Sequence, residues 1–155
     1  NDHKPALLEV LRGLDILLIN DTETKMLAGN ANLVKAARAV LATGPRMLVV
    51  KHGEYGATAF YGHDGGGAKT FRAPALPLEE VVDPTGEGDS FAGGFFGYLA
   101  SQNELTPGAF RRAMFYGGVM GSFAVERFGT DRLQHLTRQE IEIRFEQFRE
   151  LTHLD

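Results

Sequence analysis

A chain of 155 residues, 43% hydrophobic and 23% charged, can bury one ordinary globular core and leaves little room for a second domain. Its 16 basic and 20 acidic residues form no basic stripe, so we expect neither nucleic acid nor an anionic membrane as partner. The absence of cysteine excludes disulfides and thiolate metal sites, and no apolar run reaches the roughly 18 residues of a membrane span, which predicts a soluble, cytoplasmic protein.

The first half of the chain alternates helical and strand patterns. An amphipathic helix is predicted to end near Leu14, and buried strands are predicted at 15–19 and 47–51, where apolar side chains run without alternation. Helices at about 21–27 and 32–42 separate these strands, which predicts a βαβ unit.

The second half begins with β structure and continues as helices. A hairpin is predicted from 57–61 and 69–73 around the glycine-rich tip His63–Gly67, followed by a strand at Glu80–Val82. Helices are then predicted at about 89–101, 107–126 and 138–151; Thr106-Pro107 begins the second of these, and Thr137 with Glu140 forms a capping box for the third. The predicted class is α/β, layered around a mostly parallel sheet.

The strongest functional signal is the segment Asp83-Pro84-Thr85-Gly86-Glu87-Gly88-Asp89, at a predicted strand-to-helix junction. Backbone N–H groups are unpaired at such a helix start, and the helix dipole is positive there. Gly86 and Gly88 allow the backbone to approach a ligand closely, so the segment predicts a phosphate cradle. A carboxylate at Asp89 repels phosphate, and in phosphoryl transfer its purpose would be to accept the proton of an attacking hydroxyl.

Alternatives to this interpretation exist. Asp89 could simply cap the helix while the glycines make the turn. A dinucleotide fingerprint would need glycine at Phe91, which argues against a redox enzyme that uses NAD. A Walker A loop would need lysine at Ala68.

Polar residues also follow each of the two buried strands. Asn20 and Glu23 could hold a hydrated magnesium ion or could form a capping box. Lys51 is followed by Gly53 and Gly56, which could pass along a nucleotide or make a tight turn into the hairpin.

Three glycines, Gly117, Gly118 and Gly121, interrupt a predicted helix, where each costs roughly 1 kcal/mol relative to alanine. Either a neighbouring helix packs closely there or a flat ligand such as adenine lies over that surface. The five histidines are dispersed and receive no role.

Together these motifs resemble the ribokinase-like, or PfkB, family of carbohydrate and nucleoside kinases. Asp83-x-Thr85-Gly86-x-Gly88-Asp89 is similar to the family signature D-x-x-G-A-G-D, Asn20 and Glu23 to its N-x-x-E element, and Gly53 and Gly56 to its G-x-x-G turn. The resemblance implies a Rossmann-like (ribokinase-like) three-layer sandwich, present here as the C-terminal, nucleotide-binding portion over residues 1–155. Family members are roughly twice as long, and the substrate-binding half and the β-lid that also serves dimerisation are not matched.

The resemblance also implies roles. Asp89 would be the catalytic base, and the backbone N–H groups of Gly86, Glu87, Gly88 and Asp89 would form the anion hole. Asn20 and Glu23 would organise Mg²⁺ and phosphates through water, while Lys51, Gly53 and Gly56 would lie along ATP. Gly118, one of the three helix glycines, is a further candidate for ATP binding. Many members bind potassium beside the anion hole. The resemblance implies that Asp83, Thr85 and the backbone near Phe128-Gly129-Thr130 would form this site here.

One residue departs from the signature: Glu87 stands where the family usually has alanine, and we expect its side chain to face solvent. Our leading hypothesis is an ATP-dependent kinase that phosphorylates an alcohol group of a sugar or nucleoside. The alternative is a nucleotide-binding module without catalysis, because the substrate half is not matched. The resemblance is also compatible with a homodimer of the full-length protein.

Overall fold

The structure is a computed structural model, and it describes residues 3–62 and 69–153. The chain divides into two compact units, one of residues 1–52 with 58–72 and the other of residues 53–57 with 73–155. Each unit is described by itself below. The predicted hairpin tip His63–Gly67 lies outside the described residues.

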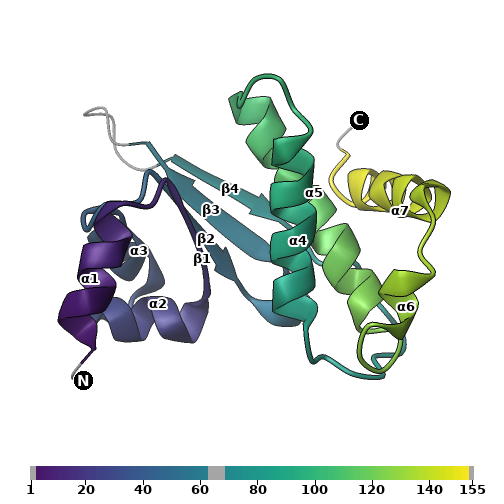
Figure 1. Cartoon of the computed structure of the whole chain (residues 1–155), viewed down its shortest axis with the longest axis horizontal. Coiled ribbons are helices and arrows are strands. Elements are labelled where there is room, and N and C mark those ends of the chain that lie inside the picture. The colour runs from purple at the N-terminus through teal and green to yellow at the C-terminus, as the bar shows by residue number, and fades with distance from the viewer. Residues whose placement is uncertain (1–2, 63–68, 154–155) are drawn as a thin grey trace. The chain divides into compact units, whose positions relative to one another are not determined.

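The first unit contains the sheet and three helices (Figure 1). Its helices are α1 (Lys4–Arg12), α2 (Asp21–Ala28) and α3 (Leu33–Leu41). The sheet has the order β1-β2-β3-β4, with strands β1 (Ile16–Asn20), β2 (Met47–Lys51), β3 (Ala57–Tyr61) and β4 (Lys69–Ala73).

The βαβ unit predicted from the sequence is confirmed, because β1 and β2 pair in parallel with Ile16 opposite Met47 and Asn20 opposite Lys51. The apolar side chains of Leu48 and Val50 on β2 pack with Val40 of α3 and Phe60 of β3 in one buried cluster. Burial of this strand on every residue from 47 to 50 explains why its sequence shows no alternation. The α/β class is therefore confirmed.

The second unit is mainly helical, with a 3₁₀ turn (Gly53–Tyr55) and helices α4 (Glu87–Ala100), α5 (Pro107–Ala124), α6 (Asp131–Gln134) and α7 (Arg138–Glu150). Helices α4 and α5 lie side by side (Figure 1), and the backbone of Tyr116 packs directly on Gly94. On the other side of α5, Val119 and Phe123 pack with Phe145 and Phe148 of α7.

The predicted helix caps of this unit are confirmed. Thr106 accepts a hydrogen bond from the N–H of Ala109 at 3.1 Å, and Thr137 forms a capping box with Glu140. No described helix is long and apolar enough to cross a lipid bilayer.

The strand predicted at Glu80–Val82 is wrong. Val81 and Val82 are 56% and 44% exposed, and the N–H groups of Val82 and Asp83 both donate to the carbonyl of Val125, at 2.9 and 3.3 Å. An apolar pair of β-branched residues favours a strand, but a strand also needs a neighbouring strand to pair with. Within the described residues this segment finds the end of α5 instead.

Candidate active site

The start of α4 is built on a glycine in the left-handed conformation. Gly86 is the N-cap residue with φ +82°, and as a glycine it has no side chain with which to cap the helix. A residue with a Cβ is strained in this left-handed conformation, which explains the glycine. The N–H of Glu87 donates to the carbonyl of Pro84 at 3.2 Å, whereas the N–H groups of Gly88 and Asp89 donate to no backbone carbonyl in the described part of the chain.

Asp89 lies in the first turn of α4, and its residue is exposed. It is the third residue of the helix and does not occupy the N-cap position, so the interpretation of Asp89 as a mere cap is wrong. The exposed carboxylate therefore stands in the same turn as two N–H groups that can bind an anion.

Asp83 and Thr85 form a tight turn that meets the loop after α5. The N–H of Thr85 donates to Oδ1 of Asp83 at 3.0 Å. Hydrogen bonds from the backbone and hydroxyl of Thr85, and a further one from the backbone of Gly129, hold the pKa of Asp83 below its usual value. The structure thus brings together Asp83, Thr85 and Gly129, three of the residues predicted to surround potassium.

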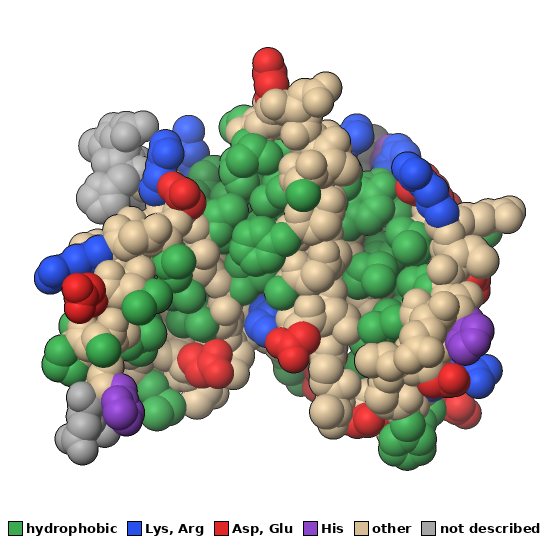
Figure 2. Space-filling model, viewed as in Figure 1, with side chains coloured by type: hydrophobic (Ala, Val, Ile, Leu, Met, Phe, Trp, Pro, Cys, Tyr) green, Lys and Arg blue, Asp and Glu red, His purple; other side chains and the backbone are tan. Residues whose placement is uncertain are grey.

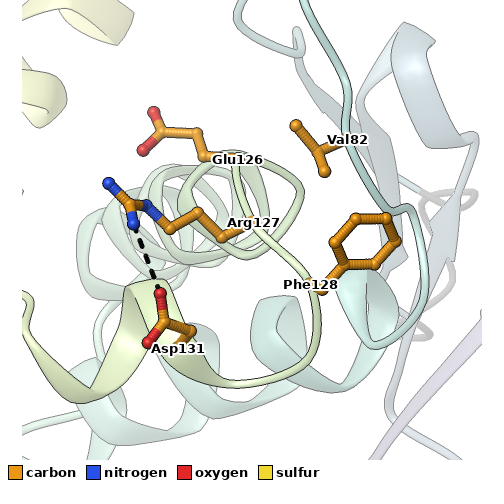
Figure 3. A pocket seen from close by; sticks show the side chains of 5 residues that line it. All are labelled: Val82, Glu126, Arg127, Phe128 and Asp131. Atoms are coloured by element: carbon orange, nitrogen blue, oxygen red, sulfur yellow. Dashed lines mark hydrogen bonds and ion pairs between the residues drawn. The ribbon is translucent and has the colours of Figure 1, made fainter.

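An open surface pocket of about 550 Å³ adjoins this turn. Val82 and Phe128 line one side of it, and Arg127 and Asp131 line the other, joined by an ion pair of 3.4 Å (Figure 3).

Glu87 corrects an expectation. Its side chain is half-buried instead of facing solvent, because it lies along α5: a Cβ added to Gly121 would come within 2.9 Å of the Glu87 Oε1 atom.

The glycines inside α5 are explained by packing. A Cβ at Gly117 would meet the ring of Phe91 at 2.9 Å, and one at Gly118 would meet the ring of Phe148 at 3.0 Å. Close contact with α4 and α7 therefore accounts for these residues. The contact of Gly118 with nucleotide stays a prediction.

In the first unit, Asn20 and Glu23 form the capping box of α2. Asn20 Oδ1 accepts from the N–H of Glu23 at 2.7 Å, and Glu23 Oε2 accepts from the N–H of Asn20 at 2.9 Å. Because Asn20 is the register partner of Lys51, these residues lie together at the carboxyl end of two parallel strands. Ligands bind at such edges of open α/β sheets.

The oxygens of these exposed side chains can accept further hydrogen bonds in addition to those of the capping box. Amide and carboxylate oxygens are suited to contact a hydrated magnesium ion. Within residues 3–62 and 69–153, no group of three or more His, Asp or Glu side chains could hold a metal directly. The magnesium role therefore stays a prediction.

Gly53 and Gly56 lie in the second unit and make the predicted tight turn. Their φ angles are +56° and +90°, and the N–H of Gly56 donates to the carbonyl of Gly53 at 3.0 Å. A Cβ at Gly56 would collide with the carbonyl of Ala73 and lie 2.6 Å from the carbonyl carbon of Pro74. The turn explains both glycines, and their contact with a nucleotide is a prediction.

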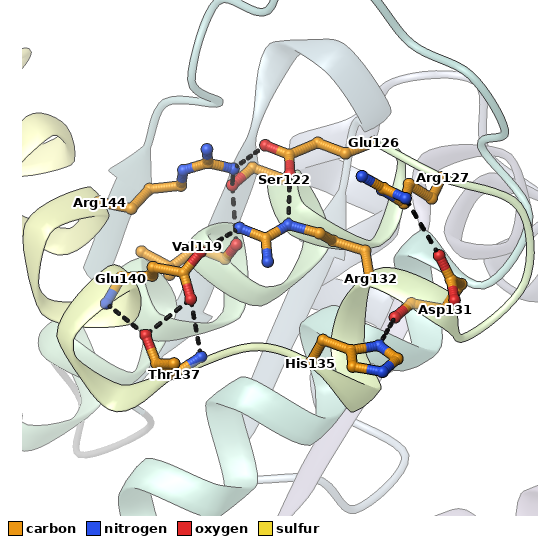
Figure 4. Close-up of polar contacts among 10 residues, drawn as sticks. All are labelled: Val119, Ser122, Glu126, Arg127, Asp131, Arg132, His135, Thr137, Glu140 and Arg144. Carbon is orange, nitrogen blue, oxygen red and sulfur yellow. Dashed lines mark hydrogen bonds and ion pairs between the residues drawn. The ribbon is translucent and has the colours of Figure 1, made fainter.

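Sequence reasoning missed a cluster of ion pairs around Glu126 and Arg132 (Figure 4). Glu126 contacts Arg132 at 2.8 Å and Arg144 at 2.6 Å, and Arg132 also contacts Glu140 at 2.6 Å. The residues of this cluster come from α6, α7 and the end of α5, so their contacts cannot be predicted from local sequence. The sequence analysis identified Glu140 only as part of a capping box.

Comparison with known proteins identifies the family. The model for "pfkB family carbohydrate kinase" matches residues 1–136. The chain belongs to the pfkB family of carbohydrate kinases. The residues matched by this pfkB model include the start of α4, where Gly86, Gly88 and Asp89 lie.

Curated relatives include the cytidine kinase of Thermococcus kodakarensis, 40% identical over 95 residues, which cover 59% of this chain and 32% of the relative. The adenosine kinase of Schizophyllum commune is 29% identical over 113 residues, or 65% of this chain and 33% of the relative. This pfkB chain thus spans about a third of the length of the curated relatives it matches.

Solved structures share the fold over a larger part. Aminoimidazole riboside kinase from Salmonella enterica, complexed with aminoimidazole riboside and an ATP analog, has a TM-score of 0.78 at 22% identity, covering 92% of this chain and 46% of that one. Fructokinase from Vibrio cholerae O395, with fructose, ADP and calcium ion bound, has a TM-score of 0.80 at 17% identity, covering 92% and 44%. A double mutant of that fructokinase was solved with potassium ion bound, at the same score and coverage.

Proposed function

We propose that this chain supplies the ATP-binding and phosphoryl-transfer part of a kinase that phosphorylates an alcohol group of a sugar or nucleoside. The observation that carries the proposal is the first turn of α4. There, left-handed Gly86 precedes an exposed Asp89 and two N–H groups that have no backbone partner among the described residues. Membership of the pfkB family, and similarity to proteins named cytidine kinase, adenosine kinase and fructokinase, support the same reaction class.

In the proposed reaction, the hydroxyl oxygen of the acceptor attacks the γ-phosphorus of ATP. The bond from that phosphorus to the β,γ-bridging oxygen breaks, ADP leaves, and the hydroxyl proton passes to the Asp89 carboxylate. The N–H groups of Gly88 and Asp89, with that of Gly86, stabilise the charge on the transferred phosphoryl group. The N–H of Glu87 contributes less to this anion hole, because it already donates to Pro84.

The other predicted residues take supporting roles in this proposal. Lys51, Gly53, Gly56 and Gly118 line ATP, and Asn20 with Glu23 would hold Mg²⁺ through water, where the ion would neutralise phosphate charge. Asp83 and Thr85, beside Gly129, would accept K⁺ through oxygens, as their turn geometry allows.

The proposal is tested first by binding. Gly86→Ala should weaken binding of MgATP to this chain by about tenfold or more, since the strained alanine rearranges the anion hole. Gly29→Ala is the matched control: Gly29 has φ +63°, and like Gly86 it has open space where a Cβ would be added. Equal loss of affinity in both variants, or no MgATP binding by the wild-type chain, would contradict the proposal.

Catalysis is tested separately with a panel of sugars and nucleosides, using this chain and any longer natural polypeptide that contains it. Transfer of phosphate to at least one acceptor is the expected result. MgATP binding without transfer to any acceptor in either form would instead favour a nucleotide-binding module.

A further inference from the structure

The loop between α5 and α6 is attached directly to the turn at Asp83. The carbonyl of Val125 accepts hydrogen bonds from the N–H groups of Val82 and Asp83, at 2.9 and 3.3 Å. The backbone of Gly129, which has φ +59°, also contributes to lowering the pKa of Asp83. The start of the loop of residues 125–129 is therefore bonded directly to Asp83.

Glu126, inside this loop, points its carboxylate in another direction, toward two arginines. Its Oε1 atom lies 2.6 Å from Arg144 of α7, and its Oε2 atom lies 2.8 Å from Arg132 of α6. The side chains of Arg144, Arg132 and Glu126 are only 17%, 19% and 27% exposed. Partly buried charges such as these depend on their partners more than fully exposed ion pairs do.

The two arginines are fixed independently of Glu126. Both guanidinium groups lie over the ring of Phe123, with the Arg144 Cζ 3.6 Å and the Arg132 Cζ 4.8 Å from its centroid. Arg132 also binds Glu140 at 2.6 Å, and Arg144 donates to the hydroxyl of Ser122 at 3.3 Å (Figure 4). Glu126 is thus the connection between a fixed pair of cations and the loop that holds Asp83.

We propose that Glu126 is a positioning residue, which holds the loop of residues 125–129 in the place where it fixes the turn at Asp83. Its effect on ATP binding rests on the function proposed above, because Asp83 begins the turn that leads to Gly86. A merely structural role would be limited to stabilising the packing of α6 and α7 against α5.

The chain offers a matched pair of variants that separates these two roles. Glu126→Gln removes the charge that faces both arginines. Glu140→Gln removes a charge from the same cluster, but glutamine preserves the capping box of α7 and leaves both contacts of Glu126 in place.

The first measurement is amide hydrogen exchange. Glu126→Gln should accelerate exchange at Val82, Asp83 and Gly129 by about tenfold relative to amides in the middle of α5, because the loop loosens locally. In Glu140→Gln, the exchange rates of these three amides should change by less than about twofold relative to the amides in the middle of α5. Acceleration that is uniform over the whole chain in Glu126→Gln, or equal at the three amides in both variants, would overturn the proposal.

The second measurement is the dissociation constant of MgATP, expected to rise about fivefold or more in Glu126→Gln and less than about twofold in Glu140→Gln. Local acceleration together with an unchanged constant would overturn the link to the phosphate site. Should the wild-type chain bind no MgATP, the proposed function fails, while the exchange result still decides whether Glu126 positions the loop.

Glu126→Asp covers the case in which Glu126→Gln does not fold. Aspartate keeps the charge but is one methylene shorter, so it cannot reach both arginines. The same local acceleration is expected, with a smaller amplitude, and its absence would overturn the proposal.

Discussion

The carboxylate of Glu87 lies against the backbone of Gly121, so closely that a Cβ at position 121 would be 2.9 Å from Oε1 of Glu87. Glu87 replaces the alanine that is usual in the resembled signature, and the missing side chain at position 121 creates the space that the longer residue uses. The two positions therefore form one unit of packing between the first turn of α4 and α5.

This relationship predicts coupling between the two positions. Gly121→Ala in the wild-type background gains helix propensity but displaces Glu87, so we expect little net change in the free energy of unfolding. In a Glu87→Ala background the same substitution should stabilise by about 1 kcal/mol. Urea unfolding of the four proteins checks this, and additive effects would show that the contact carries no energy.

Adjacent glycines of α4 should respond oppositely to alanine. A Cβ at Gly94 would collide with the carbonyl oxygen of Tyr116 and lie 2.7 Å from the Cγ of Met120, so Gly94→Ala should destabilise by about 1–3 kcal/mol.

Gly93→Ala is the control for this prediction, because a Cβ there meets nothing within 4 Å. In Figure 2 a strip of tan atoms, the colour of the backbone and of side chains such as serine, runs along α4. Gly93→Ala should stabilise by about 0.5–1 kcal/mol. Thermal unfolding decides between them, and a melting temperature that moves in the same direction for both variants would refute the packing described for α4 and α5.

Alanine substitutions at Gly53 and Gly56 allow the cost of a strained backbone dihedral to be measured separately from the cost of a steric collision. Gly53→Ala places a Cβ in open space and should lose only the roughly 1–2 kcal/mol of a left-handed alanine. Gly56→Ala adds a collision with Ala73 and Pro74 and should lose clearly more. Equal losses of unfolding free energy in the two variants would contradict this prediction, because they would show that residues 73–75 move aside at no cost.

Acid should weaken the ion-pair cluster. Hydrogen bonds from the hydroxyl and backbone of Thr137, and then from Arg132, lower the pKa of Glu140 from 4.5 to about 2. A lowered folded-state pKa gives stability that is complete above the ordinary value and is lost as pH falls toward about 2. Glu140→Gln should therefore be less stable than wild type near neutral pH, with a difference that shrinks on acidification through this range. A difference in unfolding free energy that does not change with pH would contradict the assignment.

Local chemistry made much of the fold predictable from the sequence. The unbroken apolar run at 47–50 predicted buried β2, and the pairs Asn20–Glu23 and Thr137–Glu140 predicted capping boxes, because each signal depends on residues within one or two turns. The strand predicted at Glu80–Val82 failed for the opposite reason, since strand formation depends on a partner that the local sequence does not contain.

In the candidate site, too, the features set by neighbouring residues were predictable and those set by distant residues were not. The Gly86–Asp89 turn was located by its own residues, whereas the place of Glu87 depended on Gly121, which lies on another helix. The contacts of Glu126 with Arg132 and Arg144 were not predictable, because they require the packing of three segments around Phe123.

The central claim is that Asp89 is the base of a phosphoryl transfer, and the turnover of Asp89→Asn tests it most directly. In a form of the protein that phosphorylates an acceptor, kcat should fall by about 10²–10⁴, while the MgATP dissociation constant and the melting temperature stay near wild type. Glu79→Gln, which alters an exposed carboxylate outside α4, should leave kcat unchanged. Near-normal turnover of Asp89→Asn would contradict the account.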